Sequence, residues 1–201
     1  MRFQDILAGI QSFRHGLVNN WLYQSCVFLL VLGLGALPLS VHAQSRLEQI
    51  ALSLEQNSSI DHVEKKMVLD ALVENDSSLL LFDVRTEEEY AVSHLANATR
   101  LDPGSDPADF IRRYGGLLEE NEVIFYCPTG RRSTELAEKV AAALQVQGRA
   151  VAPKNMRGGI FHWHDAFNPL NSAAGATDRV HPYSWFSKRL LTRKDQASYT
   201  P

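Results

Sequence analysis

Residues 123–133, which read V-I-F-Y-C-P-T-G-R-R-S, join an apolar run with strand character to a thiol at Cys127. A short loop follows, and residues 133–147 then have a helical pattern. A strand that leads into a helix places the thiol beside the helix N-terminus, where unpaired backbone N–H groups favour negative charge. Arg131 and Arg132 add positive charge. These conditions favour the thiolate, which is the nucleophilic form of cysteine.

Strand and helix patterns also alternate on both sides of this stretch. Residues 79–82 form a second continuous apolar run, which suits a strand buried on both faces of a parallel sheet. Thr86 and Glu89 have the spacing of a capping box, which predicts a helix from Glu87 to about Ser93. The alternation predicts an α/β domain with a mainly parallel sheet.

Weaker patterns predict the remaining elements. Helices are expected at residues 62–73, 108–114 and 160–167, and short strands at 98–101 and 149–152. Residues 44–59 are a lead-in segment that contains a short helical pattern. Residues 171–178 resemble a linker, and after it an aromatic arm is expected to dock Tyr183, Trp185 and Phe186 on the domain.

The N-terminus differs from the rest of the chain. Cys26 to Leu39 is an uncharged apolar run, shorter than the about 20 residues that a bilayer span needs. Val41 and Ala43 fit a small-residue cleavage site, so residues 1–43 are interpreted first as a signal peptide of an exported, periplasmic or extracellular protein. The alternative is an uncleaved membrane anchor over residues 21–41. Cleavage would leave Cys127 as the only cysteine.

Composition narrows the function classes. The chain has 201 residues, of which 45% are hydrophobic and 21% charged, as in a soluble globular protein. The net charge of −3 gives no reason to expect a nucleic-acid partner. No cofactor motif is visible, and His162 and His164 lack a third ligand, so neither a cofactor nor a metal is expected.

Five short motifs occur in a fixed order along residues 60–170. They are Asp83-Val84-Arg85, the acidic helix start through Glu89-Tyr90, His94 to Ala98, Tyr126 to Ser133, and Arg157 to Trp163. In this order and spacing they resemble the rhodanese-like domain family. The resemblance implies a central, mainly parallel five-stranded sheet flanked by helices, with the active-site loop at the C-terminal end of a central strand.

The resemblance also implies sulfurtransferase chemistry through a persulfide on Cys127. A thiolate would take a sulfane sulfur from thiosulfate or a similar donor and pass it to cyanide or a thiol. The expected substrate-binding residues lie in the loop and the first helical turn: Thr129, Gly130, Arg131, Arg132 and Ser133. Pro128 has no N–H, so this loop has one donor fewer for an anion.

Two charged residues at the end of the neighbouring strand, Asp83 and Arg85, are expected to support the site, and Glu89 is expected to pair with Arg85. His94 is expected to be a capping or packing residue, and Trp163 a core residue. Contact with a membrane is expected only if the leader is not cleaved.

Two alternatives to a sulfurtransferase share this architecture. A phosphatase or arsenate reductase needs the larger loop Cys-x5-Arg, whereas four residues separate Cys127 from Arg132. The shorter loop favours attack on sulfur. A non-enzymatic persulfide carrier or interaction module would need the same fold without turnover, and the sequence leaves this alternative open.

Overall fold

The computed structural model describes residues 45–201. The apolar run and the expected cleavage site therefore lie outside the described residues, and the signal and anchor interpretations stay predictions. Among residues 45–201, no helix is both long and apolar enough to cross a bilayer.

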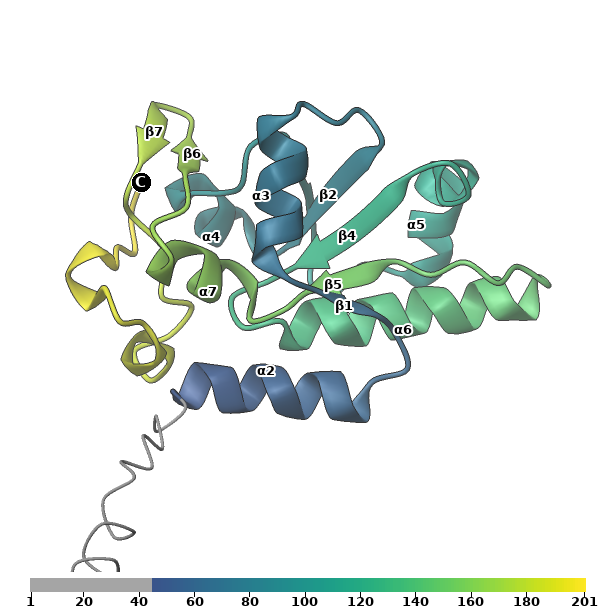
Figure 1. Cartoon of the computed structure of the whole chain (residues 1–201), viewed down its shortest axis with the longest axis horizontal. Coiled ribbons are helices and arrows are strands. Elements are labelled where there is room, and N and C mark those ends of the chain that lie inside the picture. Colours follow the sequence, from purple (N-terminus) through teal and green to yellow (C-terminus); the bar gives the residue numbers. More distant parts are fainter. Residues whose placement is uncertain (1–44) are drawn as a thin grey trace, which may run out of the picture. The chain divides into compact units, whose positions relative to one another are not determined.

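A five-stranded parallel sheet forms the centre of the domain, in the order β1-β5-β4-β2-β3 (Figure 1). The strands are β1 (His62–Val63), β2 (Leu79–Val84), β3 (Thr99–Leu101), β4 (Glu122–Tyr126) and β5 (Lys154–Met156). This confirms the predicted α/β class. Because the strands are parallel, their carboxyl ends share one edge of the sheet, and Cys127 follows β4 at this edge.

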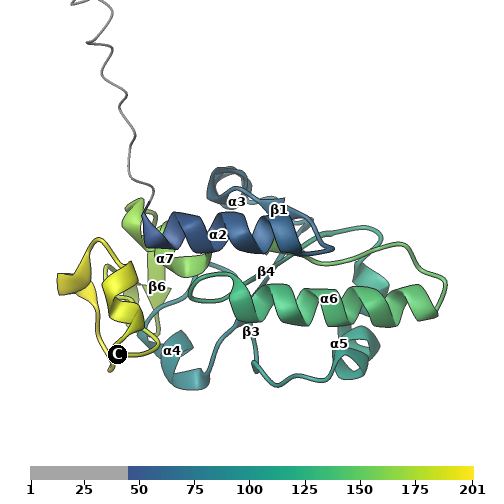
Figure 2. The same ribbon diagram turned by 90° about the horizontal axis from the view of Figure 1, so that it is seen from below.

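Helices cover both faces of the sheet (Figures 1 and 2). They are α2 (Arg46–Asn57), α3 (Lys65–Val73), α4 (Glu87–Val92), α5 (Pro107–Tyr114), α6 (Arg131–Val146) and α7 (Gly159–Asp165). Among residues 45–201, three short 3-10 turns complete the helical elements: η1 (Gly115–Leu117), η2 (Ser187–Leu190) and η3 (Lys194–Gln196).

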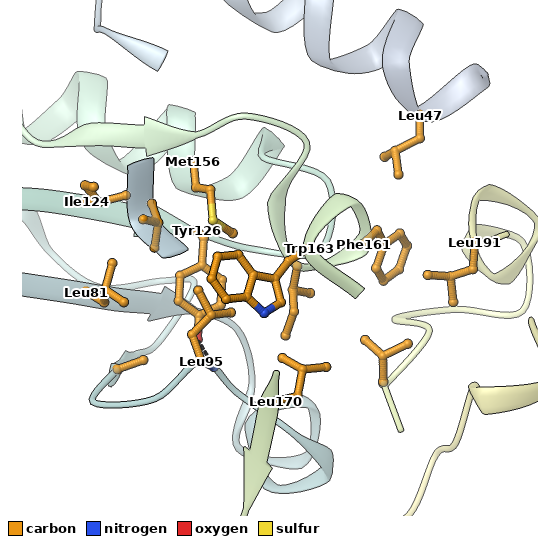
Figure 3. Packing of buried hydrophobic residues seen from close by; sticks show 14 residues of the cluster. Leu47, Leu81, Leu95, Ile124, Tyr126, Met156, Phe161, Trp163, Leu170 and Leu191 are labelled. Carbon is orange, nitrogen blue, oxygen red and sulfur yellow. Dashed lines mark hydrogen bonds between the residues drawn. The ribbon is translucent and has the colours of Figure 1, made fainter. Parts of the chain in front are cut away.

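Alternate residues of β4 enter two separate cores, as its pleat requires. Ile124 and Tyr126 pack with Trp163 of α7, whereas Val123 and Phe125 pack with residues of α5 and α6. Figure 3 shows the first core, which Leu47 of α2 and Leu191 of the C-terminal segment also enter. Both of these leucines are 1% exposed, so the segments on either side of the α/β domain are packed against it.

Two predicted elements were wrong in position. Residues 62–73 are not one helix, because His62–Val63 pairs with β5 before α3 begins at Lys65. The strand expected at 149–152 lies instead at Lys154–Met156. Arg149 follows α6 and is held there by its ion pair with Glu119, so the chain enters the sheet between β1 and β4 only at Lys154.

The C-terminal region also differs from the expectation. Residues 171–178 are not a linker, since β6 (Leu170–Ser172) and β7 (Gly175–Thr177) form an antiparallel hairpin. The expected aromatic anchors Tyr183, Trp185 and Phe186 are 52%, 69% and 67% exposed. The buried anchors of this segment are aliphatic or imidazole side chains: Val180, His181 and Leu191.

Candidate active site

Cys127 lies between the end of β4 and the start of α6. Its side chain is 1% exposed and lines a cavity of about 210 Å³. Gly130 adopts φ +95° and begins α6 without a side-chain cap. The backbone N–H groups of the first helical turn are therefore available to an anion beside the sulfur.

The N-terminus of α7 holds the Cys127 loop from the other side. The N–H groups of Ile160 and Phe161 donate to the carbonyls of Cys127 (2.9 Å) and Pro128 (3.0 Å). Gly159 precedes them at φ +60°, and a Cβ atom there would lie 2.1 Å from the Cys127 carbonyl oxygen. The conformation of the loop thus depends on close backbone contact with a glycine of another motif.

Arg132 makes a bidentate ion pair with Glu89 of α4. Its guanidinium donates to the two carboxylate oxygens at 2.8–3.0 Å, and Glu89 is 2% exposed. The same guanidinium lies 4.7 Å from the centre of the Tyr183 ring. Glu89 was expected to pair with Arg85, and that prediction was wrong. Both terminal nitrogens of Arg132 therefore donate to Glu89, which leaves less of its hydrogen-bonding capacity for an anion.

Arg131 differs from Arg132 in its surroundings. It is exposed, lines the cavity, and has no hydrogen-bond or ion-pair partner among residues 45–201. Of the two adjacent arginines, Arg131 therefore has the charge that is free to meet an anionic substrate.

Asp83 and Arg85 form an ion pair that is fully buried. Arg85 Nε donates to Asp83 Oδ1 (2.7 Å), and one terminal nitrogen donates to the Ser93 carbonyl (2.6 Å). Burial is the largest single influence and acts to lower the pKa of Arg85. The charge and hydrogen bonds of Asp83, with the smaller effects of Tyr126 and Glu89, together outweigh burial, so the pKa lies above the ordinary value. Asp83 is paired in register with Tyr126, next to Cys127, which is consistent with support of the site from the neighbouring strand.

Ser133 was expected to bind substrate, but its side chain is directed into the protein. The Ser133 hydroxyl lies 2.6 Å from Asn155 Oδ1 and 3.0 Å from the Gly130 carbonyl. Asn155 Nδ2 lies 3.2 Å from His62 Nδ1. Burial lowers the pKa of His62 and so favours the neutral ring, whose Nδ1 can accept this bond. Only the backbone N–H of Ser133 remains for a ligand.

His94 and Trp163 are packed against other residues, as the sequence predicted. The His94 ring stacks on Tyr90 at 3.9 Å, in agreement with a packing role. Trp163 is fully buried, as predicted. Within residues 45–201, no group of three or more His, Cys, Asp or Glu side chains is arranged to hold a metal ion.

Comparison with known families and structures adds to this geometry. The model of the rhodanese-like domain matches residues 65–166. The chain belongs to the rhodanese-like domain family. Thiosulfate:glutathione sulfurtransferase of Saccharomyces cerevisiae is 29% identical over 100 residues, which cover 45% of this chain and 71% of the yeast protein. Family and relative together support an enzyme of the sulfurtransferase type.

Solved structures are also similar to this chain. The As-Sb reductase from Leishmania major has a TM-score of 0.49 and 19% identity, and the match covers 57% of this chain and 86% of the reductase. A rhodanese-like domain from Anabaena sp. has a TM-score of 0.44 and 14% identity, with 55% of this chain and 78% of that domain covered.

Part of the cavity wall lies outside the matched rhodanese-like domain. The loop contributes Pro128, Thr129, Arg131 and Arg132, whereas α2 and the C-terminal segment contribute Ile50, Tyr183, Ser187 and Leu190. A wider groove of about 610 Å³ shares Ile50, Arg131 and Leu190 with the cavity and continues along α2. Figures 1 and 2 both show α2 beside the start of α6. Neither segment carries a local motif that would have predicted these contacts.

Opposite outcomes are expected for the two adjacent arginines of the rhodanese-like loop. Arg132→Ala leaves the buried Glu89 carboxylate without its cation, which is expected to lower the free energy of unfolding by about 3 kcal/mol. Arg131→Ala removes an exposed, unpaired charge, so stability is expected to change by less than about 0.5 kcal/mol. For the thiosulfate reaction that the family resemblance implies, the kcat/KM of Arg131→Ala should instead fall about tenfold or more.

Urea unfolding and steady-state kinetics of both variants measure these effects. Glu89→Gln is the matched control, because it also breaks the ion pair but keeps Arg132 beside the cavity. If Arg132→Ala unfolds like the wild type and loses only thiosulfate use, Arg132 binds substrate and the ion pair contributes little.

Proposed function

We propose that the protein is a sulfurtransferase in which Cys127 carries the transferred sulfur as a persulfide. The single observation that carries this proposal is the position of Cys127, which lines a cavity and lies next to the uncapped first turn of α6. A thiolate and an anionic persulfide are both favoured there by backbone N–H groups and the helix dipole. The family membership and the yeast sulfurtransferase support the same class of reaction.

The first half-reaction moves a sulfane sulfur to Cys127. The thiolate attacks the outer sulfur of thiosulfate, the S–S bond of the donor breaks, and its electron pair leaves with sulfite. Cys127 then carries a second sulfur with one negative charge. In this proposal the donor's charged oxygens bind to Arg131 and to the backbone N–H groups of residues 129–133, beginning with Thr129. The lining of the cavity by Arg131 and the uncapped start of α6 support these roles.

The second half-reaction releases the sulfur to an acceptor. A thiolate or cyanide attacks the terminal sulfur of the persulfide, and the electron pair of the broken S–S bond returns to Cys127. The groove along α2 adjoins the cavity and is wide enough for a thiol larger than cyanide. The yeast relative is named thiosulfate:glutathione sulfurtransferase, and glutathione is a thiol. This name favours a thiol as the acceptor here.

The arrangement of Arg132 is less suited to a phosphatase or arsenate reductase. Those reactions need an arginine that cradles a tetrahedral oxyanion, whereas Arg132 is directed to Glu89. A persulfide carrier without turnover remains the second candidate, because it would use the same Cys127 cavity.

One experiment separates these functions. The protein is incubated with thiosulfate, its intact mass is recorded, and cyanide is then added and thiocyanate measured. A gain of one sulfur with repeated turnover is the expected result. A sulfur gain with a single release of thiocyanate supports the carrier. No sulfur gain, together with hydrolysis of an aryl phosphate, would overturn the proposal.

Export is a separate proposal that rests on the sequence. The apolar run from Cys26 to Leu39 and the small residues Val41 and Ala43 favour removal of residues 1–43 and release outside the cytoplasm. Expression of the whole chain followed by N-terminal sequencing should find Gln44 first. An intact Met1 in the membrane fraction would instead support the anchor.

A further inference from the structure

The wall of the Cys127 cavity that faces the catalytic loop is largely apolar and comes from outside the rhodanese-like domain. It consists of Ile50 from α2 and of Tyr183, Ser187 and Leu190 from the C-terminal segment. The neighbours of this wall in sequence, Leu47 and Leu191, are each 1% exposed in the core (Figure 3). The wall is therefore a fixed part of the site, because both segments are anchored beside it.

The charges of the cavity suit a small dianion poorly. Of the two arginines that line it, Arg132 is paired with Glu89, so its charge is largely compensated. Arg131 remains as the unpaired cation among the described lining residues. Thiosulfate carries two negative charges on five heavy atoms and has no apolar group to place against Ile50 or Leu190. Thiosulfate would lose water from its charged oxygens when it moves next to apolar side chains, and a single arginine replaces those interactions only in part.

The size of the cavity leaves space for an organic group. It encloses about 210 Å³. Apolar cavities of about 150 Å³ in other proteins accept benzene. A donor with one negative charge and a group up to the size of a benzene ring would place its charge at Arg131 and the α6 N–H groups. Its organic group would then contact Ile50, Leu190 and the Tyr183 ring.

We propose, on the basis of the proposed sulfurtransferase function, that the preferred donor is an organic sulfane-sulfur compound and that Ile50 and Leu190 determine this specificity. For an organic thiosulfonate, the Cys127 thiolate attacks the outer sulfur and the S–S bond of the donor breaks. Its electron pair leaves with the sulfinate, and Cys127 keeps the sulfur as an anionic persulfide. The step needs no added oxidant or reductant.

The test compares kcat/KM for benzenethiosulfonate, methanethiosulfonate and thiosulfate, with cyanide as the acceptor. The wild-type chain is expected to prefer benzenethiosulfonate to thiosulfate by about tenfold or more. Leu190→Ala and Ile50→Ala truncate this wall in the C-terminal segment and in α2, and each should lower this ratio about tenfold. Leu190→Phe fills the cavity and should reduce benzenethiosulfonate use more than methanethiosulfonate use.

Phe186→Ala is the control, because Phe186 lies on the same segment but is 67% exposed and does not line the cavity. Its donor ratio should equal that of the wild type. A wild-type preference for thiosulfate, or ratios that do not change in the Leu190 and Ile50 variants, would overturn the inference. The mass measurement keeps this failure distinct: a Cys127 persulfide formed from thiosulfate leaves the proposed function intact, whereas no persulfide from any donor removes both.

Discussion

Cys127→Ser is expected to lower sulfur transfer by about four orders of magnitude or more and to prevent any gain of sulfur in mass. The proposed reaction passes through a bond between the Cys127 sulfur and the transferred sulfur, and a serine hydroxyl at neutral pH is neither ionised nor able to form a persulfide. The substitution changes one atom in a side chain that is 1% exposed, so the fold should be retained. Loss of activity would then report on chemistry and not on folding.

Intact mass after incubation with thiosulfate, and thiocyanate release after cyanide, measure this effect. Cys26→Ser is the matched control, since it removes the other cysteine of the chain and should retain both the sulfur gain and the turnover. A Cys127→Ser protein that still gains sulfur, or a Cys26→Ser protein that cannot, would show that Cys127 is not the sulfur carrier.

Local signals in the sequence were sufficient for the centre of the fold. The apolar runs before Asp83 and Cys127 became β2 and β4, because continuous apolar residues are stable only where both sheet faces are covered. Thr86 and Glu89 formed the predicted capping box, since its hydrogen bonds join residues only three positions apart. The strand-to-helix transition at Cys127 was predicted because the signals of both elements lie within a few residues of it.

The partners of the charged side chains could not be predicted in this way. Arg132 and Glu89 are 43 positions apart, and nothing local indicates which carboxylate an arginine will meet once α6 and α4 are brought together. Ser133 likewise contacts Asn155, which lies 22 positions later on β5. Aromatic residues near the C-terminus predicted the wrong anchors, because Leu191 and Val180 are buried whereas Trp185 is 69% exposed.

Gly159→Ala is expected to be the most destabilising single methyl addition in the candidate active site. Gly159 has φ +60°, and its added Cβ would lie 2.1 Å from the Cys127 carbonyl oxygen and 2.8 Å from the carbonyl carbon of Pro128. Both neighbours are backbone atoms, so neither can rotate away as a flexible side chain would. The left-handed conformation adds about 1 kcal/mol for a residue with a side chain.

The loop and α7 can relieve this clash only by moving apart, which breaks the hydrogen bonds from Ile160 and Phe161 to the loop carbonyls. We expect a loss of about 4 kcal/mol in the free energy of unfolding, which corresponds to a fall in Tm of about 10 °C. Any protein that folds should also form the Cys127 persulfide more slowly, because the sulfur is displaced from the α6 N-terminus.

Thermal unfolding and the rate of sulfur gain by mass measure the two effects. Gly116→Ala is the control, since a Cβ there would meet no atom within 4 Å and the position does not have positive φ. Its Tm should stay within about 1 °C of the wild type. A Gly159→Ala protein as stable and as active as Gly116→Ala would mean that the loop does not depend on close contact with α7. The Arg157-Gly158-Gly159 motif would then serve only to begin that helix.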